Sequence, residues 1–423
     1  MLDVLSNKGK GEPLKKNLIA ILFDLGDTIM DESTEIKDAN EITLSADLIP
    51  DMAEAVRWLR AQGYPLAIVA DARPDTPINV LKQHGLLDLF DCLSVSEIVG
   101  AEKPDERLFL HALQSMRIPE EDYPRVMMVG NNLERDIAGA NRLGLRSVYF
   151  HVNERRRSIP RNRVEAPRHT VTSAQELLDL VTALAVEVPA AQPPRDLGQP
   201  EELELVAAFA PLICFDKAEP FLPLTVGYTL FKREEQSPSF FRRIQRDWRP
   251  AWTTAIEYAI WWDWDIGHLY ELEHVWTYLD EADRLVWVEA SSHGGYASMI
   301  LEDGTIPCYG THPIVYSQPG KHAFSPTPHW FTMFRDLVCQ AASDYAGAEG
   351  VLIKEQYVRQ IPETREINAL AGNWLRRRAF MPTLQFCRQF QIRPDQLVPW
   401  PILDAWIPAR VNWWIDRLRA DGV

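Results

Sequence analysis

The sequence predicts an α/β protein: an N-terminal doubly wound parallel sheet, then a mostly β-sandwich domain with C-terminal helices. In residues 17–186, short apolar runs alternate with stretches of helical periodicity, which is typical of a parallel sheet with crossover helices. Residues 187–200 are proline-rich, which indicates an extended linker. Thirteen of the 14 tryptophans lie after residue 247, so the composition changes after the linker. We therefore expect a second domain over 201–423.

Composition excludes several classes of protein. A chain of 423 residues is longer than one ordinary core, and its net charge of −16 argues against nucleic-acid binding. No apolar run is long enough to predict a transmembrane segment, and we expect residues 1–16 to be a loose polar arm. The five scattered cysteines fit reduced thiols, so a cytoplasmic protein is expected. The oligomeric state does not follow from the sequence.

The first half predicts a regular order of elements. An acidic, mixed stretch over 30–48 indicates a flap or short hairpin. Strands are expected at 18–23, 65–69, 126–129 and 146–150, and helices at 50–62, 76–84, 105–115, 134–143 and 174–186.

The first strand organises this half, because its apolar run stops at Asp24 and the turn residues Gly26, Asp27 and Thr28 follow. Ligands of open α/β sheets bind beyond the carboxyl ends of the strands. Asp24 is therefore either a carboxylate that faces a pocket or only the cap of a turn.

Four segments favour the first interpretation. FDLGDT, AIVAD (67–71), EKPD (102–105) and VGNNLERDIAGANRLGL (129–145) resemble, in order and spacing, the four motifs of the haloacid dehalogenase (HAD) superfamily. The resemblance covers residues 18–165 and implies an aspartyl intermediate on Asp24, a charge-neutralising Lys103, and Mg²⁺ held by Asp24 with Asn131 and Asp136. Mg²⁺ and Lys103 would offset the repulsion between the carboxylate and a phosphate.

Three positions depart from the family pattern. Gly26 stands where the family has its acid–base aspartate, with Asp27 one residue further on. Ala70, followed by Asp71, replaces the phosphate-binding Ser or Thr, and Asn131 replaces an aspartate. The resemblance leaves three alternatives: an Mg²⁺-dependent phosphatase, a metal-independent relative of the dehalogenase branch, or a catalytically inert scaffold.

The substrate side is less defined. The intervals 25–68 and 71–102 are too short for a cap domain, so an open site is expected, which takes a large substrate or is covered by other residues. Arg155 and Arg156 begin a basic run that leaves the last strand, and either bind an anionic substrate or form a solvated loop.

The second half contains an acidic and histidine-rich pattern over 257–281. GHLYELEHV (267–275) and SSHGGY (291–296) resemble, in part, the necrosis- and ethylene-inducing-like proteins, and GKHAF (320–324) is similar to a vacuolar-protein-sorting-type domain family. Both resemblances imply a β-sandwich with a divalent-cation site, for which oxygen-rich ligands suit Mg²⁺ or Ca²⁺. The ligands carried over are His268, Glu271 and Glu273, with Asp263 or Asp265 as the upstream acid. Structural ion pairs at a strand edge are the alternative.

From residue 330 onward the apolar spacing predicts helices, and the tail is rich in tryptophan. We interpret these aromatic residues as core or interface anchors, with a tunnel for a lipid-like substrate as the alternative. The sequence as a whole predicts phosphoester hydrolysis by the first domain. The alternative is an inert first domain, with a C-terminal domain that carries the activity or binds a sugar- or lipid-type ligand.

Overall fold

The structure is a computed structural model that describes residues 17–247 and 249–420. The arm predicted for residues 1–16 lies outside the described residues. By its contacts the chain divides into two compact units: one of residues 1–131, 145–153 and 171–187, and one of 132–144, 154–170 and 188–423. Each unit is described by itself. No helix among the described residues has the length and apolar character needed to cross a membrane.

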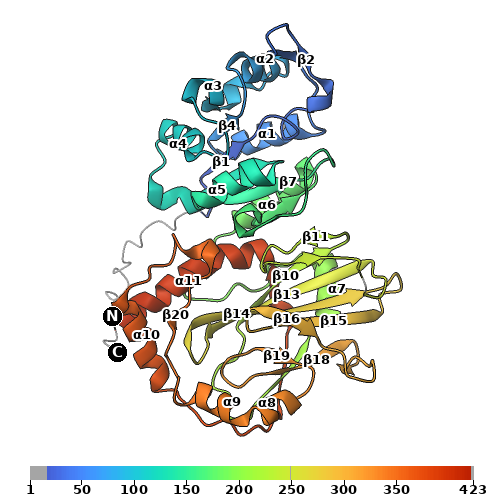
Figure 1. Cartoon of the computed structure of the whole chain (residues 1–423), viewed down its shortest axis with the longest axis vertical. Helices are drawn as coiled ribbons and strands as arrows, with labels where there is room; N and C mark the ends of the chain where they lie inside the picture. Colours follow the sequence, from blue (N-terminus) through green and yellow to red (C-terminus); the bar gives the residue numbers. More distant parts are fainter. Residues whose placement is uncertain (1–16, 248, 421–423) are drawn as a thin grey trace, which may run out of the picture. The chain divides into compact units, whose positions relative to one another are not determined.

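A six-stranded sheet forms the centre of the N-terminal unit (Figure 1). Its order is β5-β4-β1-β6-β7-β8, and the pairs from β5 to β7 are parallel. The strands are β1 (Ala20–Phe23), β4 (Leu66–Ala70), β5 (Cys92–Val95), β6 (Val126–Gly130), β7 (Arg146–Phe150) and β8 (His169–Val171). The doubly wound sheet expected from the alternating pattern is confirmed, while β5 and β8 were not predicted.

The helices of this unit follow the expected spacing. In α1 (Met52–Ala61) the buried residues Met52, Ala55, Val56 and Leu59 lie on one face, as the sequence period requires. The other connecting helices are α2 (Asp75–Gln83), α3 (Ser96–Val99), α4 (Glu106–Ser115) and α6 (Ala174–Leu184). The helix predicted over 134–143, whose residues belong to the second unit, begins as a π-helix, η4 (Leu133–Ile137), and continues as α5 (Ala138–Arg142).

The acidic stretch after β1 forms a short 3₁₀-helix and a hairpin. The helix η1 spans Glu32–Thr34, and the strands β2 (Ile36–Lys37) and β3 (Thr43–Ser45) pair antiparallel. The predicted short hairpin over 30–48 is therefore confirmed.

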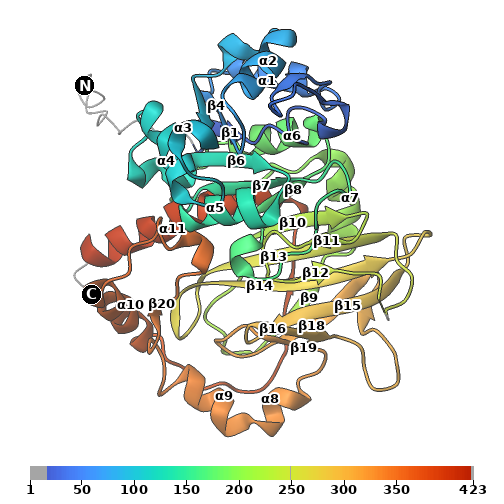
Figure 2. The same ribbon diagram turned by 45° about the horizontal axis from the view of Figure 1, so that its top comes forward.

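The second unit contains two β-sheets, whose strands can be followed in Figure 2. The seven-stranded sheet has the order β16-β15-β14-β13-β10-β22, with β20 paired to β14. The five-stranded sheet has the order β17-β18-β9-β21, with β19 paired to β18. Phe215 of β9 and Trp262 of β13 meet edge to face with ring centroids 6.5 Å apart, within one buried cluster that both sheets share. The predicted β-sandwich is confirmed by this packing.

The bounds of these strands show how the sandwich is built. The long central hairpin is β13 (Thr254–Trp264) and β14 (His268–Leu279). The others are β9 (Leu212–Phe215), β10 (Thr225–Phe231), β15 (Leu285–Ser292), β16 (Gly295–Ser298), β17 (Cys308–Tyr309), β18 (His312–Ser317), β19 (Phe324–Ser325), β20 (Gly350–Val351), β21 (Arg388–Gln391) and β22 (Leu397–Pro399). A separate small hairpin consists of β11 (Glu235–Gln236) and β12 (Arg243–Ile244).

Residues after 330 form the expected C-terminal helices together with three short strands. The helices are α8 (His329–Met333), α9 (Arg335–Ala342), α10 (Arg365–Arg376) and α11 (Trp400–Ala420), and α7 (Pro200–Ala208) precedes the sandwich. Between them β20, β21 and β22 complete the two sheets, because the sheets still have edges to pair at this point of the chain. The tryptophans Trp400 and Trp406 of α11 belong to the buried core, as interpreted from the sequence.

The proline-rich segment has no helix or strand between residues 186 and 199, but it is fixed along α11. Arg410 Nη1 donates to the carbonyls of Ala190 and Ala191 at 3.1 and 2.8 Å, and Trp406 Nε1 donates to that of Pro189 at 3.2 Å. The segment is therefore part of the second unit, whereas the domain boundaries at 186 and 201 stay a prediction.

Candidate active site and candidate metal centre

Polar residues follow three neighbouring strands of the N-terminal sheet. Asp24 follows β1, Asp71 follows β4, and Asn131 follows β6. Phe23 pairs with Ile68 on one side and Val129 on the other, in parallel register. Parallel strands in register end at the same edge of a sheet, so these residues come together at the carboxyl edge.

The centre of this edge is a buried ion pair. Lys103 Nζ lies 2.6 Å from Asp24 Oδ1 and donates to the carbonyl of Val69 at 3.0 Å. Asp24 is 9% exposed and Lys103 5% exposed, so water screens the pair weakly. Asp71 Oδ1 accepts the backbone N–H of Lys103 at 2.8 Å and so holds the residue that carries the ammonium group. The predicted pairing of Asp24 with Lys103 is present in the geometry.

In the turn after β1, Asp27 stabilises the backbone conformation. Asp27 is buried with a positive φ of 49°, and its Oδ1 accepts the backbone N–H of Glu32 at 3.1 Å. Gly26 has no side chain, but the carboxyl group of Glu32 lies against it: an ideal Cβ on Gly26 would be 2.1 Å from Glu32 Oε1. Sequence reasoning missed Glu32, because the residue stands in a polar insertion with no periodic pattern.

The turn after β6 carries the predicted metal ligands. Asn131 is buried, and its Nδ2 has no acceptor within the part of the chain that the structure describes. Asn132 caps η4 by accepting from the backbone N–H groups of Glu134 and Arg135, and Asp136 Oδ2 accepts the N–H of Asn132 at 2.9 Å. The carboxylate of Asp24 and the side-chain oxygen of Asn131 are oxygen ligands of the kind that a hard cation such as Mg²⁺ takes.

The predicted phosphate-binding residues are placed as follows. Ala70 is buried at the end of β4 and offers no side-chain donor, while Asp71 serves Lys103. Arg155 and Arg156 are exposed residues of the second unit. Their part in binding a substrate stays a prediction.

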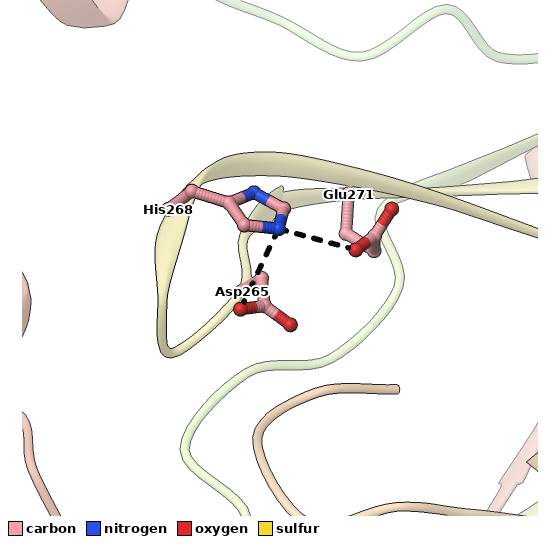
Figure 3. A group of neighbouring side chains, drawn as sticks. All are labelled: Asp265, His268 and Glu271. Atoms are coloured by element: carbon pink, nitrogen blue, oxygen red, sulfur yellow. Dashed lines mark ion pairs between the residues drawn. The ribbon is translucent and has the colours of Figure 1, made fainter. Parts of the chain in front are cut away.

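A second group of polar residues lies where the β13–β14 hairpin turns. Figure 3 shows Asp265, His268 and Glu271 directed toward one another. His268 Nε2 is 3.7 Å from Asp265 Oδ1 and 3.5 Å from Glu271 Oε2. His268 Nδ1 lies 2.7 Å from the carbonyl of Tyr270, which requires a proton on Nδ1, and Nε2 faces the two carboxylates.

A lysine lies in the same group. Lys321 Nζ is 2.8 Å from Asp265 Oδ1 and 3.1 Å from Glu349 Oε2. Burial acts to raise the pKa of Asp265, but the opposing charges of His268, Lys321 and His322 lower it below its ordinary value. The ammonium group of Lys321 is therefore a positive charge that a bound divalent cation would have to displace or share.

Two of the predicted ligands do not join this group. Burial, and then the charge of Glu271, raises the pKa of Glu273 to about 8, and Glu273 contacts the hydroxyl of Ser291. A protonated carboxyl group is a poor cation ligand at neutral pH. Asp263 is instead held by Arg410, with Nη2–Oδ2 and Nε–Oδ1 distances of 2.6 and 2.9 Å. Asp263 and Asp265 do not share a strand face, because β13 ends at Trp264.

Comparisons with known proteins address the first 144 residues. Residues 14–144 match the family model of haloacid dehalogenase-like hydrolases. The chain is similar to glyceraldehyde 3-phosphate phosphatase of Methanopyrus kandleri, at 30% identity over 32% of this chain and 57% of the relative. It is similar to ribulose-1,5-bisphosphate 5-phosphatase of Halopiger xanaduensis, at 34% identity over 32% of this chain and 57% of the relative.

A third relative is pyrimidine 5′-nucleotidase YjjG of Escherichia coli, at 39% identity over 24% of this chain and 42% of the relative. The chain thus spans about half the length of the curated relatives it matches. Among solved structures, a HAD phosphatase from Thermococcus onnurineus covers 40% of this chain and 100% of its own, at 20% identity and a TM-score of 0.33. Residues 14–144 thus match the haloacid dehalogenase-like hydrolases, while the resemblances named for residues 257–324 stay predictions.

Proposed function

We propose that the protein hydrolyses phosphoesters through an aspartyl intermediate on Asp24. The observation that carries this proposal is the buried ion pair of Asp24 and Lys103 at the carboxyl edge of the sheet. A carboxylate nucleophile repels a phosphate dianion, and a buried ammonium group 2.6 Å away offsets that repulsion. Asp71 and Val69 direct the ammonium group by holding both ends of the lysine.

The proposal includes Mg²⁺. Asp24 and Asn131 would hold it, with Asp136 as a further predicted ligand. The ion supplies positive charge that offsets the charge of the phosphate. Lys103 leaves Asp24 Oδ2 available, because it pairs with Oδ1.

The substrate class follows from the charges and from the relatives. The relatives are named as phosphatases of glyceraldehyde 3-phosphate and ribulose 1,5-bisphosphate and as a nucleotidase. We infer an anionic phosphoester. Only η1, α1 and the β2–β3 hairpin separate β1 from β4, so a large or lipid-like phosphoester is included in the proposal.

The test is turnover of a panel of phosphomonoesters with Mg²⁺ by the full chain. We expect wild-type activity that Asp24→Asn lowers at least about a thousandfold, because the nucleophile is lost. Asp88→Asn removes an exposed carboxylate of the same unit and should leave turnover unchanged. Absence of wild-type turnover, or equal turnover in wild type and Asp24→Asn, would contradict the proposal.

A second candidate function is favoured by the orientation of His268. Its Nδ1–H is committed to Tyr270, which is how metal-binding histidines are commonly fixed. We infer that Asp265, His268 and Glu271 bind Mg²⁺ or Ca²⁺ in the second unit. If this unit carries the activity, or binds a sugar- or lipid-type ligand, we place that function at the same site.

Calcium binding can be measured in an Asp24→Asn background, where the first site is weakened. Titration calorimetry with Ca²⁺ should show binding that the added change His268→Ala removes, because a cation ligand is lost. An equal binding isotherm for both variants would contradict the second site. Phosphatase turnover that persists in Asp24→Asn and disappears in His268→Ala would assign the activity to the second unit.

A further inference from the structure

Hydrolysis through an aspartyl phosphate needs a proton donor and acceptor besides the nucleophile. The leaving oxygen of an alkyl ester must gain a proton, and the attacking water must lose one. At the carboxyl edge Asp24 is the proposed nucleophile and Asp71 holds the backbone of Lys103. Asp27 holds the backbone of Glu32. Asp71 and Asp27 thus each have one carboxylate oxygen engaged by a backbone N–H group.

Glu32 brings a further carboxyl group to the turn that follows Asp24. A Cβ on Gly26 would lie 2.1 Å from its Oε1, 2.8 Å from its Cδ and 2.9 Å from its Cγ. The carboxyl group therefore occupies the space in which a side chain at position 26 would begin. Gly26 is two residues after Asp24, so the carboxyl group stands beside the turn that carries the nucleophile.

The chain holds Glu32 in this place by local hydrogen bonds. The backbone N–H groups of Ile29 and Met30 both donate to the carbonyl of Leu25, at 2.9 and 3.0 Å, which closes the turn. Asp31 caps η1 by accepting the backbone N–H of Ser33 at 2.9 Å. The close approach of Glu32 to Gly26 is thus built by the fold of residues 25–34.

We propose that Glu32 is the acid–base catalyst of the N-terminal site, supplying from position 32 the carboxyl group that position 26 lacks. This inference rests on the proposed phosphoester hydrolysis. Asp24 attacks phosphorus and the ester P–O bond breaks, while the carboxyl proton of Glu32 goes to the leaving oxygen. The Glu32 carboxylate then takes a proton from water as the water oxygen attacks phosphorus. The bond between phosphorus and the Asp24 oxygen breaks, which releases phosphate and restores the Asp24 carboxylate and the protonated Glu32.

Leaving-group dependence separates this role from a structural one. p-Nitrophenolate leaves without a proton, whereas an alkoxide does not. With p-nitrophenyl phosphate, Glu32→Gln should keep a rapid burst of about one nitrophenolate per chain, since only the later attack of water needs the base. Steady-state turnover should fall about a hundredfold or more, and an alkyl phosphate should give neither burst nor turnover.

Matched variants complete the experiment. Glu41→Gln changes an exposed carboxylate of the same insertion and should behave as wild type. Gly26→Ala leaves residue 32 a glutamate but should still lower turnover, because the added Cβ displaces the carboxyl group of Glu32. Gly26→Asp in a Glu32→Ala background should recover at least about tenfold of the lost turnover, since it returns a carboxyl group to the same space.

The outcomes are distinguishable. An inactive wild type overturns both this inference and the proposed function. Turnover that depends on Asp24 but is unchanged in Glu32→Gln overturns the inference alone. Equal losses for aryl and alkyl substrates without a burst also overturn it, because they indicate that Glu32 only maintains the fold of the turn. Failure of Gly26→Asp to recover turnover in the Glu32→Ala background counts against it too.

Discussion

At the scale of single residues, the ion pair of Asp24 and Lys103 is the main chemical feature of the N-terminal site. Both side chains are nearly excluded from water, so each depends on the other for compensation of its charge. In the proposed mechanism the ammonium group offsets the repulsion between the carboxylate nucleophile and the phosphate. The same contact therefore contributes to stability and to the proposed catalysis.

Removal of one partner should be costly to the fold. Lys103→Met leaves Asp24 buried without its cation and should lower the free energy of unfolding by about 3 kcal/mol. The double change Asp24→Asn with Lys103→Met should regain much of this loss, because no buried charge remains. Urea unfolding of the wild type, both single variants and the double variant measures the coupling, and additive losses would contradict it.

The sequence predicts the positions of site residues at strand ends better than those of site residues in the loop after β1. Asp24 and Lys103 were predictable, because apolar strands stop abruptly and the motif spacing is regular. Glu32 was not, since its approach to Gly26 depends on the fold of a turn. Asp263 and Asp265 stayed alternatives for the upstream acid, because the sequence does not show that the strand ends between them, at Trp264.

At the scale of elements, the β13–β14 hairpin places ionisable groups inside the protein. Glu257 of β13 is fully buried, and its carboxyl oxygens accept from Ser237, Ser239 and the indole of Trp276. His274 of β14 contacts Ser239 Oγ through Nε2 at 2.9 Å. Burial raises the pKa of Glu257 and lowers the pKa of His274 well below its ordinary value.

These two shifts have opposite effects on the pH dependence of stability. The unfolded chain protonates His274 below about pH 6.5 and the folded chain does not, so this contribution to stability is lost as pH falls. Folded Glu257 keeps its proton above pH 4.5, where the unfolded chain loses it, so this contribution is lost as pH rises. Between these values the two slopes oppose each other.

In Glu257→Gln, the free energy of unfolding should therefore show the pH dependence that His274 contributes. From about pH 5 to 6.5, its unfolding free energy should rise more steeply than that of wild type, by up to about 1.4 kcal/mol per pH unit. Urea unfolding across this range measures the difference. Glu281→Gln, an exposed control, should match wild type, and parallel pH profiles for Glu257→Gln and wild type would show the prediction to be wrong.

Elements with strong periodicity were predictable and short ones were not. The helix α1 follows from apolar spacing, because burial on one face requires it. The strands β5, β21 and β22 have at most four residues and were missed, since neighbouring strands rather than their own sequence define them.

At the scale of the whole molecule, the proline-rich segment shows the limit of composition as a guide. Its prolines predict an extended linker, and it does lack helix and strand. Its fixed position depends on Arg410, which also pairs with Asp263. No local pattern could indicate a partner so distant along the chain.

Arg410→Met should release this segment. It removes the donor to Ala190 and Ala191 and leaves Asp263 without its cation, so cleavage by a broad-specificity protease within 188–199 should become at least about tenfold faster. Arg419→Met, an exposed change on the same helix, is the control. Equal cleavage rates in Arg410→Met and wild type would mean that other contacts fix the segment.

The contact between Arg410 and residues 190–191 also sets an order of events during synthesis. The two partners are 220 residues apart for the carbonyl of Ala190, and β21 and β22 pair with strands made long before them. Every strand of the N-terminal sheet has been translated by residue 171, so that sheet can form while the rest is still being made. The second unit cannot close until residue 410 has left the ribosome. Its strands, of which β9 begins at Leu212, therefore remain incompletely packed until then.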